Sequence, residues 1–287
     1  MKYGVLGMGI MGTPMAENLL KEGNEVVVWN RTREKCERPA SLGAQVAARP
    51  ADVIRECDIC FTMVSDPQAS HDVCFSEGGV LESICPGKSY IDVSTITPEM
   101  AQQIAAAIAE RGGRFLEAPV SGSKKPAEDG NLVFLCGGDR SLFEEALPAL
   151  EIMGKKSFYL GEAGRGAQMK LVINMIMGTM MAAFAEGLSL GDKAGLDQQD
   201  IIEVLAQGAI ANPMFSLKGP LMADGKFQVA FPLKHMQKDM RLAQLLADEF
   251  AQGVSAAAVA NNYYIKAKGK GYGDEDFSAV YKAVIDD

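Results

Sequence analysis

The chain has 287 residues, 48% of them hydrophobic and 23% charged, and carries a formal net charge of −9 at pH 7. This length predicts about two domains of an ordinary globular protein, and the negative charge disfavours nucleic acid and acidic membranes as partners. The most hydrophobic stretch, residues 171–185, is shorter than a membrane span and contains Asn174 and Thr179. Because the first predicted strand begins at residue 3, we expect no signal peptide and a cytoplasmic protein.

A G-x-G-x-x-G pattern lies at residues 7–12 and reads Gly7-Met8-Gly9-Ile10-Met11-Gly12. It follows a short apolar strand predicted at residues 3–6 and precedes a predicted helix, and this context is typical of a dinucleotide-binding site. Gly7 would permit the tight turn, Gly9 would let the backbone approach a pyrophosphate, and Gly12 would let the helix pack closely on the strand. The N–H groups at the start of the helix would bind the phosphates.

The second predicted strand ends in Asn30-Arg31-Thr32-Arg33, without an acidic residue. NAD sites usually place Asp or Glu at this point, where the carboxylate binds the ribose 2′-hydroxyl. A 2′-phosphate would repel such a carboxylate and would pair well with a guanidinium group. We therefore predict NADP(H) as the cofactor, with Arg31 as the main contact and Asn30, Thr32 and Arg33 in support.

Strands and helices alternate through roughly the first 160 residues. Strands are predicted at residues 3–6, 25–30, 59–64, 90–93, 114–118, 132–136 and 158–160, and helices at residues 13–21, 33–42, 50–56, 68–75, 98–111 and 142–152. This alternation predicts an α/β fold with an N-terminal, Rossmann-type doubly wound sheet. No helix is predicted between the strands at 114–118 and 132–136, so this edge of the sheet is expected to be antiparallel or mixed.

The sequence changes character after a glycine-containing connection at residues 161–166. Helices are predicted at residues 167–194, 198–208, 233–250, 256–268 and 277–285, and no strand is predicted among them. The first is long enough to pass from one domain to the other, and its methionines would pack in a core or at a subunit interface. We predict a dinucleotide-binding Rossmann domain at residues 1–162. An all-α C-terminal domain for substrate binding and dimerisation, at residues 163–287, would begin with the long interdomain helix.

Six cysteines, at positions 36, 57, 60, 74, 85 and 136, show no disulfide spacing. Cys57 and Cys60 form a C-x-x-C sequence, but residues three apart on a strand face opposite sides, so their thiols are not expected to meet. We expect buried free thiols and a reducing compartment. The two histidines lack neighbours at metal-ligand spacing, and no metal site is predicted.

Small and polar residues recur where successive strands end. They are Ser65 and Asp66 after the strand that ends at Val64, then Ser94 and Thr95, and then Ser121, Gly122, Ser123 and Lys124. Each one alone is most often a helix cap or a turn residue. Ligands of open α/β sheets bind at the carboxyl ends of the strands, however, so the recurrence predicts a shared cleft. Val64, Ser65 and Thr95 are candidate cofactor contacts, and Ser94 and Thr95 are candidate substrate contacts.

Lys170 is the predicted proton-transfer residue. It lies near the start of the long helix, four residues before Asn174, so the two side chains share a helix face among apolar neighbours. A lysine in such surroundings is costly unless it is paired or functional. The alternative is an ordinary lysine whose stem reaches water. An ordinary lysine is charged at neutral pH and therefore ready to act as an acid in a reduction.

Over essentially its whole length the chain resembles the β-hydroxyacid dehydrogenase family. The matching segments are Gly7–Gly12, Asp92–Thr95, Ala118–Gly122, Gly164–Asn174 and the pair Lys238-Asp239. The resemblance implies that Lys170 is the catalytic lysine and Asn174 its partner. It also implies that Ser121 and Gly122 hold the substrate carboxylate, that Thr95 lies against the nicotinamide, and that Lys238 contacts the cofactor. Phe231 is a further candidate for substrate binding.

Many family members continue with Ser-Gly-Gly after the Pro-Val pair, whereas this chain reads Ser121-Gly122-Ser123-Lys124-Lys125-Pro126. This form resembles the glyoxylate/succinic semialdehyde reductase branch. The resemblance implies NADPH-dependent reduction of succinic semialdehyde to 4-hydroxybutyrate and of glyoxylate to glycolate, with Lys170 as general acid, in a homodimer or homotetramer. A dehydrogenase of the 3-hydroxyisobutyrate or tartronate semialdehyde type is the alternative, and a non-catalytic NADP(H)-binding module is an alternative of another class.

Overall fold

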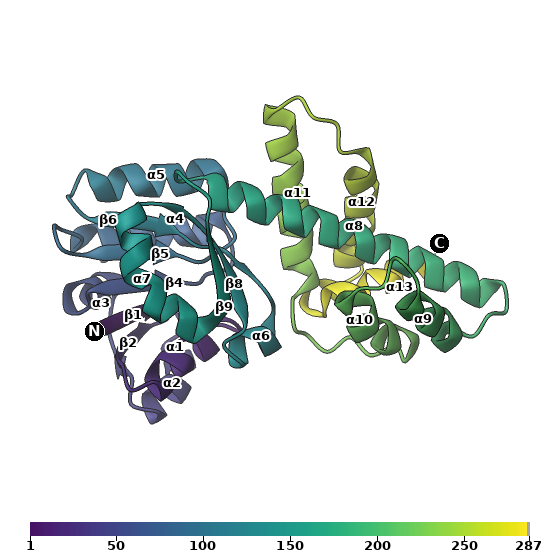
Figure 1. Cartoon of the computed structure of the whole chain (residues 1–287), viewed down its shortest axis with the longest axis horizontal. Coiled ribbons are helices and arrows are strands. Elements are labelled where there is room, and N and C mark those ends of the chain that lie inside the picture. Colours follow the sequence, from purple (N-terminus) through teal and green to yellow (C-terminus); the bar gives the residue numbers. More distant parts are fainter. Residues whose placement is uncertain (286–287) are drawn as a thin grey trace. The chain divides into compact units, whose positions relative to one another are not determined.

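Residues 1–285 are described by a computed structural model, in which two units are distinguished: Met1–Lys170 and the residues from Leu171 onward (Figure 1). The first unit contains the sheet. Its strands are β1 (Lys2–Leu6), β2 (Glu25–Trp29), β3 (Gln45–Val46), β4 (Ile59–Thr62), β5 (Ser89–Asp92), β6 (Arg114–Glu117), β7 (Val120–Ser121), β8 (Leu132–Gly138) and β9 (Gly154–Tyr159).

The strand order is β3-β2-β1-β4-β5-β6-β8-β7, with β9 beside β8. Strands β1 to β6 run parallel, β8 runs antiparallel to β6 and β7, and β9 runs parallel to β8. The predicted doubly wound sheet with a mixed edge is therefore confirmed. The order reverses between β1 and β4, and ligands of such sheets bind outside the carboxyl ends of the strands at this point.

Helices cover both faces of the sheet (Figure 1). They are α1 (Gly12–Lys21), α2 (Glu37–Ser41), α3 (Pro50–Glu56), α4 (Pro67–Phe75), α5 (Pro98–Ala109), α6 (Lys124–Glu128) and α7 (Arg140–Met153), with short 3₁₀ helices η1 (Arg33–Cys36) and η2 (Val80–Glu82). Helices α1 and α7 pack on one face and α3 and α5 on the other. Each face has its own hydrophobic core because neighbouring strand residues point to opposite sides, as Ile91 and Tyr90 do.

Three details of this unit differ from the expectations. The helix expected at residues 33–42 is divided into η1 and α2, since Pro39 has no N–H group to continue the helical bonding. A short helix, α6, lies between β7 and β8, where none is predicted. Strand β9 begins at Gly154, earlier than expected, and its first residues include the exposed Lys155 and Lys156.

The second unit is helical. Its elements are α8 (Arg165–Lys193), which begins in the first unit, then α9 (Gln198–Gln207), α10 (Pro213–Ala223), α11 (Leu233–Glu249), α12 (Ser255–Gly269) and α13 (Val280–Ile285), with η3 (Tyr272–Asp274) and η4 (Phe277–Ala279). Within residues 171–285 the only strand-like pairing is an isolated bridge between Pro232 and Asp276. Helix α10 is not among the predicted helices, although Asn212 caps it by accepting the N–H of Phe215 at 3.0 Å.

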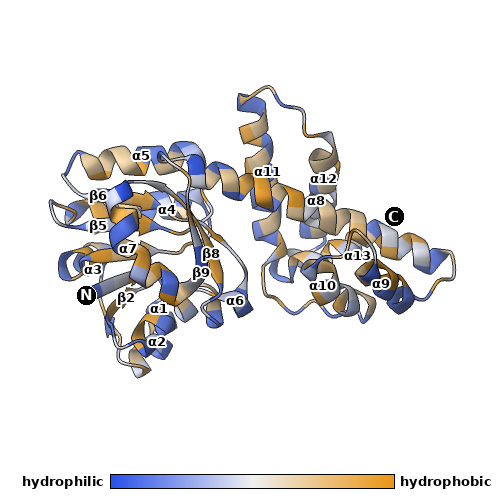
Figure 2. Ribbon diagram, in the orientation of Figure 1, coloured by the Kyte–Doolittle hydropathy of each residue, from blue (hydrophilic) through white to orange (hydrophobic). Residues whose placement is uncertain are grey.

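Helix α8 is strongly hydrophobic along its middle (Figure 2). By length and composition alone it could cross a membrane, with a mean hydropathy of 1.6 over the best window, but core helices of soluble proteins pass the same test. Its buried residues include Lys170 and Asn174, which a lipid-facing helix would not favour. The domain boundary predicted at 162/163 lies just before this helix and stays a prediction.

All six cysteines are free, and all except Cys85 are buried. The expectation of free thiols is confirmed, but the expectation that Cys57 and Cys60 face apart is wrong. Burial and a hydrogen bond with Cys57 raise the pKa of Cys60 well above its usual value. The alternation of side chains along a strand does not apply to this pair, because Cys57 directly follows helix α3 and lies before β4 begins at Ile59.

Candidate active site

The glycine turn between β1 and α1 has the form of a phosphate-binding turn. Gly7 has φ +101° and donates its N–H to the carbonyl oxygen of Trp29 at 2.8 Å. A Cβ on Gly12 would overlap the carbonyl oxygen of Gly7, so helix and strand approach each other as closely as glycine allows. A Cβ on Gly9 would meet nothing within 4 Å. The turn therefore leaves room for a pyrophosphate beside Gly9, at the N-terminus of α1.

Asn30 joins the glycine turn to the basic loop that follows β2. Its Oδ1 accepts the N–H of Met8 at 2.9 Å, and its Nδ2 donates to the carbonyl oxygen of Thr32 at 2.8 Å. The side chain of Met8 is buried in the core. Arg31, Thr32 and Arg33 are exposed, as a contact with a 2′-phosphate requires. Of the remaining residues of the turn, Ile10 is exposed and Met11 is half-buried.

The loops after β4 and β5 are tied together by Ser94. Its hydroxyl accepts the N–H of Val64 at 3.0 Å and donates to the carbonyl oxygen of Thr62 at 3.3 Å. Its own N–H donates to Asp92. Ser94 is fully buried, so its hydroxyl is engaged within the chain, and the substrate contact predicted for it stays a prediction. The structure instead shows Ser94 shaping the ends of two strands.

Ser65 and Thr95 follow the neighbouring parallel strands β4 and β5, whereas Ser121 and Gly122 lie at the end of the short strand β7, a few residues after β6. These four residues are accessible to different extents. Ser65 is exposed and donates its hydroxyl to Asp66 at 2.6 Å, while Thr95 is half-buried. Ser121 ends β7 opposite Val133 of β8, and Gly122 follows it with an exposed backbone. Because β4, β5 and β6 are parallel, the residues after them gather at one edge of the sheet.

Lys170 lies in the second turn of α8 and is only 7% exposed. The start of this helix is held by Glu117, which lies at the end of β6 and is fully buried. The Glu117 carboxylate accepts the N–H groups of Gly164, Gly166 and Ala167. Burial raises the pKa of Glu117 to about 7, although these three hydrogen bonds favour its ionised form.

The second unit contributes a buried polar cluster where α8 and α11 cross (Figure 1). The amide Nδ2 of Asn174 donates to Oδ2 of Asp239 at 2.6 Å. The ammonium of Lys238 lies 3.1 Å from Oδ1 of the same carboxylate, and its side chain is 13% exposed. Asp239 thus connects the predicted partner of the catalytic lysine with the predicted cofactor contact.

Phe231 is held next to a second buried charge. Its N–H donates to Oδ2 of Asp276 at 3.2 Å, and its ring stacks on His235 at 6.5 Å between centroids. Asp276 also forms a buried ion pair with Lys218 at 2.8 Å. This network fixes the loop before α11, so the orientation of Phe231 depends on a buried ion pair.

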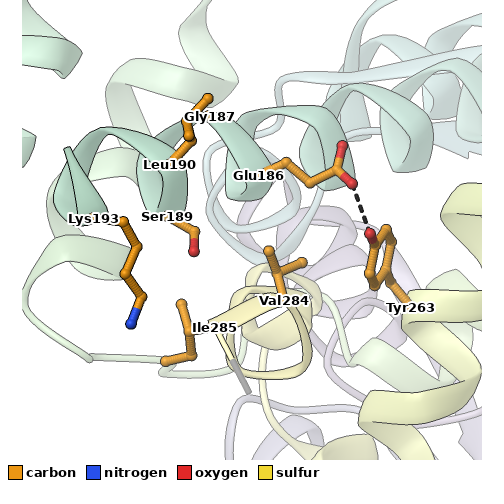
Figure 3. A pocket seen from close by; sticks show the side chains of 8 residues that line it. All are labelled: Glu186, Gly187, Ser189, Leu190, Lys193, Tyr263, Val284 and Ile285. Atoms are coloured by element: carbon orange, nitrogen blue, oxygen red, sulfur yellow. Dashed lines mark hydrogen bonds between the residues drawn. The ribbon is translucent and has the colours of Figure 1, made fainter. Parts of the chain in front are cut away.

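The second unit also has an open pocket of ≈ 440 Å³ between the second half of α8, α12 and α13 (Figure 3). It is lined by Glu186, Gly187, Ser189, Leu190, Lys193, Tyr263, Val284 and Ile285. Figure 3 shows the hydroxyl of Tyr263 donating to Glu186, at 2.7 Å. No predicted catalytic, substrate or cofactor residue lines this pocket, so it is not the candidate active site.

Sequence reasoning did not single out Glu117 or Asp239 as site residues. The sequence nevertheless marks Glu117, because this acid interrupts the apolar strand Phe115-Leu116-Glu117-Ala118. Asp239 follows Lys238 and lies on the buried side of α11. Both acids are buried in the structure, and acids are almost never fully buried without partners. Gly164 lies 47 residues from Glu117, and Asn174 lies 65 residues from Asp239, too far for any local pattern to indicate these partners.

Residues 2–161 match the family described as the NAD binding domain of 6-phosphogluconate dehydrogenase. Residues 164–284 match the family described as NAD-binding of NADP-dependent 3-hydroxyisobutyrate dehydrogenase. Both halves therefore match nucleotide-dependent dehydrogenases, and the two matches meet just before α8.

Among curated proteins, the chain is 55% identical to glyoxylate/succinic semialdehyde reductase 1 of Arabidopsis thaliana, covering 99% of this chain and 98% of the relative. It is 45% identical to the cytokine-like nuclear factor N-PAC of Homo sapiens, covering 99% of this chain and 51% of that protein. The crystal structure of 3-hydroxyisobutyrate dehydrogenase from Salmonella typhimurium superposes with a TM-score of 0.90 at 27% identity, covering 98% of this chain and 99% of that one. The chain belongs to the β-hydroxyacid dehydrogenases, a family of NAD(P)-dependent oxidoreductases that act on CH–OH groups.

Proposed function

We propose that this chain reduces short aldehyde acids with NADPH, converting succinic semialdehyde to 4-hydroxybutyrate and glyoxylate to glycolate. The observation that carries the proposal is the buried pair of Lys170 and Asn174, four residues apart on α8. A buried ammonium beside a buried amide is suited to donate a proton to a carbonyl oxygen. The name and the 55% identity of the Arabidopsis reductase support the choice of substrates.

NADPH, when bound, supplies the hydride that reduces the carbonyl carbon. The turn at Gly7–Gly12 would hold its pyrophosphate, and Arg31 with Asn30, Thr32 and Arg33 would hold its 2′-phosphate. The openness beside Gly9 and the exposure of Arg31 fit this cofactor. Val64, Ser65, Thr95 and Lys238 complete the proposed cofactor contacts.

The protein's own residues bind the substrate and move the proton. Ser121 and Gly122 would hold the substrate carboxylate, with Thr95 and Phe231 beside the carbon chain. The Lys170 Nζ would donate a hydrogen bond to the carbonyl oxygen and then transfer a proton to it as negative charge develops there. Asn174 would hold this oxygen in place, because the 2.6 Å hydrogen bond from its amide to Asp239 fixes its orientation.

The experiment that tests the proposal is a steady-state screen with purified protein. NADPH and NADH are each combined with succinic semialdehyde, glyoxylate, methylmalonate semialdehyde and tartronate semialdehyde, and loss of nicotinamide absorbance is followed. The expected result is the highest kcat/KM with NADPH and the first two substrates. A preference for tartronate semialdehyde, or for methylmalonate semialdehyde, which is the oxidation product of 3-hydroxyisobutyrate, would establish the alternative, which the 27% identical Salmonella typhimurium structure favours.

A non-catalytic NADP(H)-binding module is the second candidate function. It is favoured by the relative named cytokine-like nuclear factor N-PAC, whose name is not that of an enzyme. The buried Lys170 and Asn174 argue against it, because a pure binder needs no proton donor. Tight NADPH binding without turnover of any aldehyde or keto acid in the same screen would establish the module.

We also propose that the chain forms a homodimer or homotetramer through its second unit. Leu190 on α8 and Val204 on α9 are 73% and 70% exposed, and Leu190 and Ile285 line the pocket of Figure 3. Association of two copies would remove such apolar surface from water. Light scattering on the purified chain measures the mass directly. Leu190→Glu should lower that mass, and Leu42→Glu, a change at an exposed leucine of the first unit, should not.

A cytoplasmic location is proposed as well. It is supported by the buried, free thiols of Cys57 and Cys60, which contact each other without forming a disulfide, as in reducing compartments. Fractionation of cells that produce the tagged chain tests this location.

A further inference from the structure

The helix that carries Lys170 has no side-chain cap of its own, because the residue before it is Gly164. The first N–H groups of a helix lack acceptors within the helix. Here the acceptor comes from the sheet: Oε1 of Glu117 accepts the N–H groups of Gly164 and Gly166, both at 2.7 Å, and Oε2 accepts that of Ala167 at 3.2 Å. One fully buried carboxylate thus binds three N–H groups at the start of α8.

The same helix start is closely enclosed by two further elements. A Cβ on Gly166 would overlap the carbonyl oxygen of Leu135 in β8 and would lie 3.1 Å from Oε1 of Glu117. From α5, Gln102 donates its Nε2 to the carbonyl oxygen of Ala163 at 3.3 Å. The first turn of α8 is therefore held by β6, β8 and α5 together, with Glu117 making the shortest bonds.

This arrangement links the proposed proton donor, Lys170, to the proposed carboxylate-binding loop at Ser121, which the reaction requires at a fixed position relative to each other. Lys170 follows Ala167 by three residues, so it lies one turn beyond the capped N–H groups. Ser121 follows Glu117 by four residues on the chain that continues β6. Glu117 therefore connects the helix of the proton donor to the strand that leads into the proposed carboxylate-binding loop.

We propose that Glu117 is a positioning residue for proton transfer: its carboxylate fixes the first turn of α8, and with it the ammonium of Lys170, relative to the loop at Ser121 and Gly122. The inference rests on the proposed role of Lys170 as proton donor. Glu117 acts through the helix and does not itself contact the reacting atoms. A displacement of about 1 Å in a catalytic group can cost about 100-fold in rate, so the fixation has a measurable consequence.

The charge of Glu117 makes this role dependent on pH. The ionised carboxylate accepts all three N–H groups, whereas a protonated carboxyl places a hydrogen on one of the accepting oxygens. Burial is the main cause that raises its pKa to about 7, and the charge of Asp92 on β5 adds to it. Facing it from β8 is Cys136, whose pKa burial raises to about 12, so that its thiol is neutral, and from α5 the neutral Gln102. The cap should therefore weaken as the pH falls through about 7.

Glu117→Gln and Glu117→Ala test the proposal, with Glu162→Gln as the matched control. Glu162 is an exposed acid in the same connection, so its replacement removes the same charge without touching the cap. Each variant is measured for kcat and KM with succinic semialdehyde across pH, for the Kd of NADPH, and for amide hydrogen exchange of the peptide that contains residues 164–170.

For Glu117→Gln we expect a kcat about 10-fold lower, and for Glu117→Ala about 100-fold lower, with the Kd of NADPH within about twofold of the unchanged protein. The kcat of the unchanged protein should fall below about pH 7, and Glu117→Gln should lose this acid limb. Amides 164, 166 and 167 should exchange at least about 10-fold faster in both variants. Glu162→Gln should leave every readout unchanged.

A Glu117→Gln variant with unchanged kcat, pH profile and exchange, in an unchanged protein that is active, would overturn the inference. An equal loss of kcat at every pH, with exchange increased throughout the chain, would show a general structural defect and would also overturn it. An unchanged protein that turns over no aldehyde acid would instead overturn the proposed function. If Glu117→Ala does not fold, Glu117→Gln and the pH profile decide the outcome.

Discussion

The side-chain amide of Asn174 donates to the carboxylate of Asp239 at 2.6 Å, and both side chains are almost completely buried. The two residues are 65 positions apart, on α8 and α11. The other oxygen of the same carboxylate lies 3.1 Å from the Lys238 ammonium. Asp239 therefore orients a proposed catalytic amide and a proposed cofactor contact at once.

Replacing Asp239 by Ala should leave the Asn174 amide buried without this acceptor and Lys238 without this counter-charge. An unsatisfied buried donor costs about 1–3 kcal/mol, so we expect lower stability together with a kcat/KM at least about 10-fold lower. Urea unfolding and steady-state kinetics measure the two effects. Asp248→Ala, at an exposed position of the same helix, is the control and should change neither. Unchanged kinetics for Asp239→Ala would contradict the proposed role of this cluster.

Lys170→Met should lower kcat by about 10²–10⁴-fold, because general acid catalysis typically contributes this much. Methionine is also unbranched and has a similar helical preference, so the Kd of NADPH should remain nearly unchanged. Fluorescence titration with NADPH and single-turnover kinetics separate binding from proton transfer. Lys193→Met, at the exposed end of the same helix, should behave like the unchanged chain. Near-normal turnover in Lys170→Met would rule out its role as the acid.

Arg31→Asp should reverse the nucleotide preference. The exposed guanidinium would lose its pairing with the 2′-phosphate, and the new carboxylate would repel that phosphate while accepting a ribose hydroxyl. A charge-assisted hydrogen bond contributes about 1.5–3 kcal/mol, so the ratio of kcat/KM for NADPH over NADH should fall by about 10- to 100-fold. The control is Lys35→Asp, an identical charge change a few residues further on. An unchanged ratio in Arg31→Asp would show that the 2′-phosphate binds elsewhere.

The free energy of unfolding should depend on pH because the pKa of Glu117 is raised in the folded chain. Because its pKa is raised from 4.5 to about 7 in the folded chain, the folded state binds this proton more tightly than the unfolded state does. Burial disfavours the ionised carboxylate by more than the three hydrogen bonds of the cap favour it. The net contribution of Glu117 to the free energy of unfolding is therefore greatest below about pH 4.5 and is lost as the pH rises to about 7, by up to roughly 3 kcal/mol, although the cap itself is strongest when Glu117 is ionised.

The pH-dependent contribution of Glu117 is measured as the difference in the free energy of unfolding between the unchanged chain and Glu117→Gln, from urea unfolding at several pH values. The stability of Glu117→Gln relative to the unchanged chain should rise between about pH 4.5 and about pH 7 and stay constant above that. A difference that does not vary with pH would mean that Glu117 has an ordinary pKa in the folded chain.

The buried ion pair between Lys218 and Asp276 should matter far more for stability than an exposed pair. Asp276 also accepts the N–H groups of Ala230 and Phe231, so Lys218→Met would leave its charge buried and only partly compensated. Breaking a buried pair from one side typically costs about 3–5 kcal/mol. The exposed pair of Lys226 and Asp224 is the control, because such pairs contribute about 0–1 kcal/mol. Equal effects of Lys218→Met and Lys226→Met on the urea midpoint would contradict this prediction.

Much of the fold is predictable from local sequence. The alternation of apolar strands with helices, the glycine turn at Gly7–Gly12 and the capped, proline-started helices α4 and α5 all depend on neighbours within a few residues. The elements that the sequence did not indicate are short or contain breakers. Strands β3 and β7 have two residues each, and α10 contains Gly219 and Pro220, so their local preferences are weak. These elements form because tertiary contacts compensate for those preferences.

Part of the candidate site is likewise predictable from local sequence, and part depends on tertiary contacts. Lys170 and Asn174 are recognisable by their spacing in an apolar helix, and Arg31 by its place after the second strand, since both relations are local. Only the tertiary structure shows that Glu117 caps α8 and that the Ser94 hydroxyl connects the ends of two strands. It also shows that Asp239 contacts both Asn174 and Lys238. Those relations depend on which strand and which helix face meet across tens of residues. Periodicity determines which side of an element is buried, whereas the partner it is buried against is decided by packing.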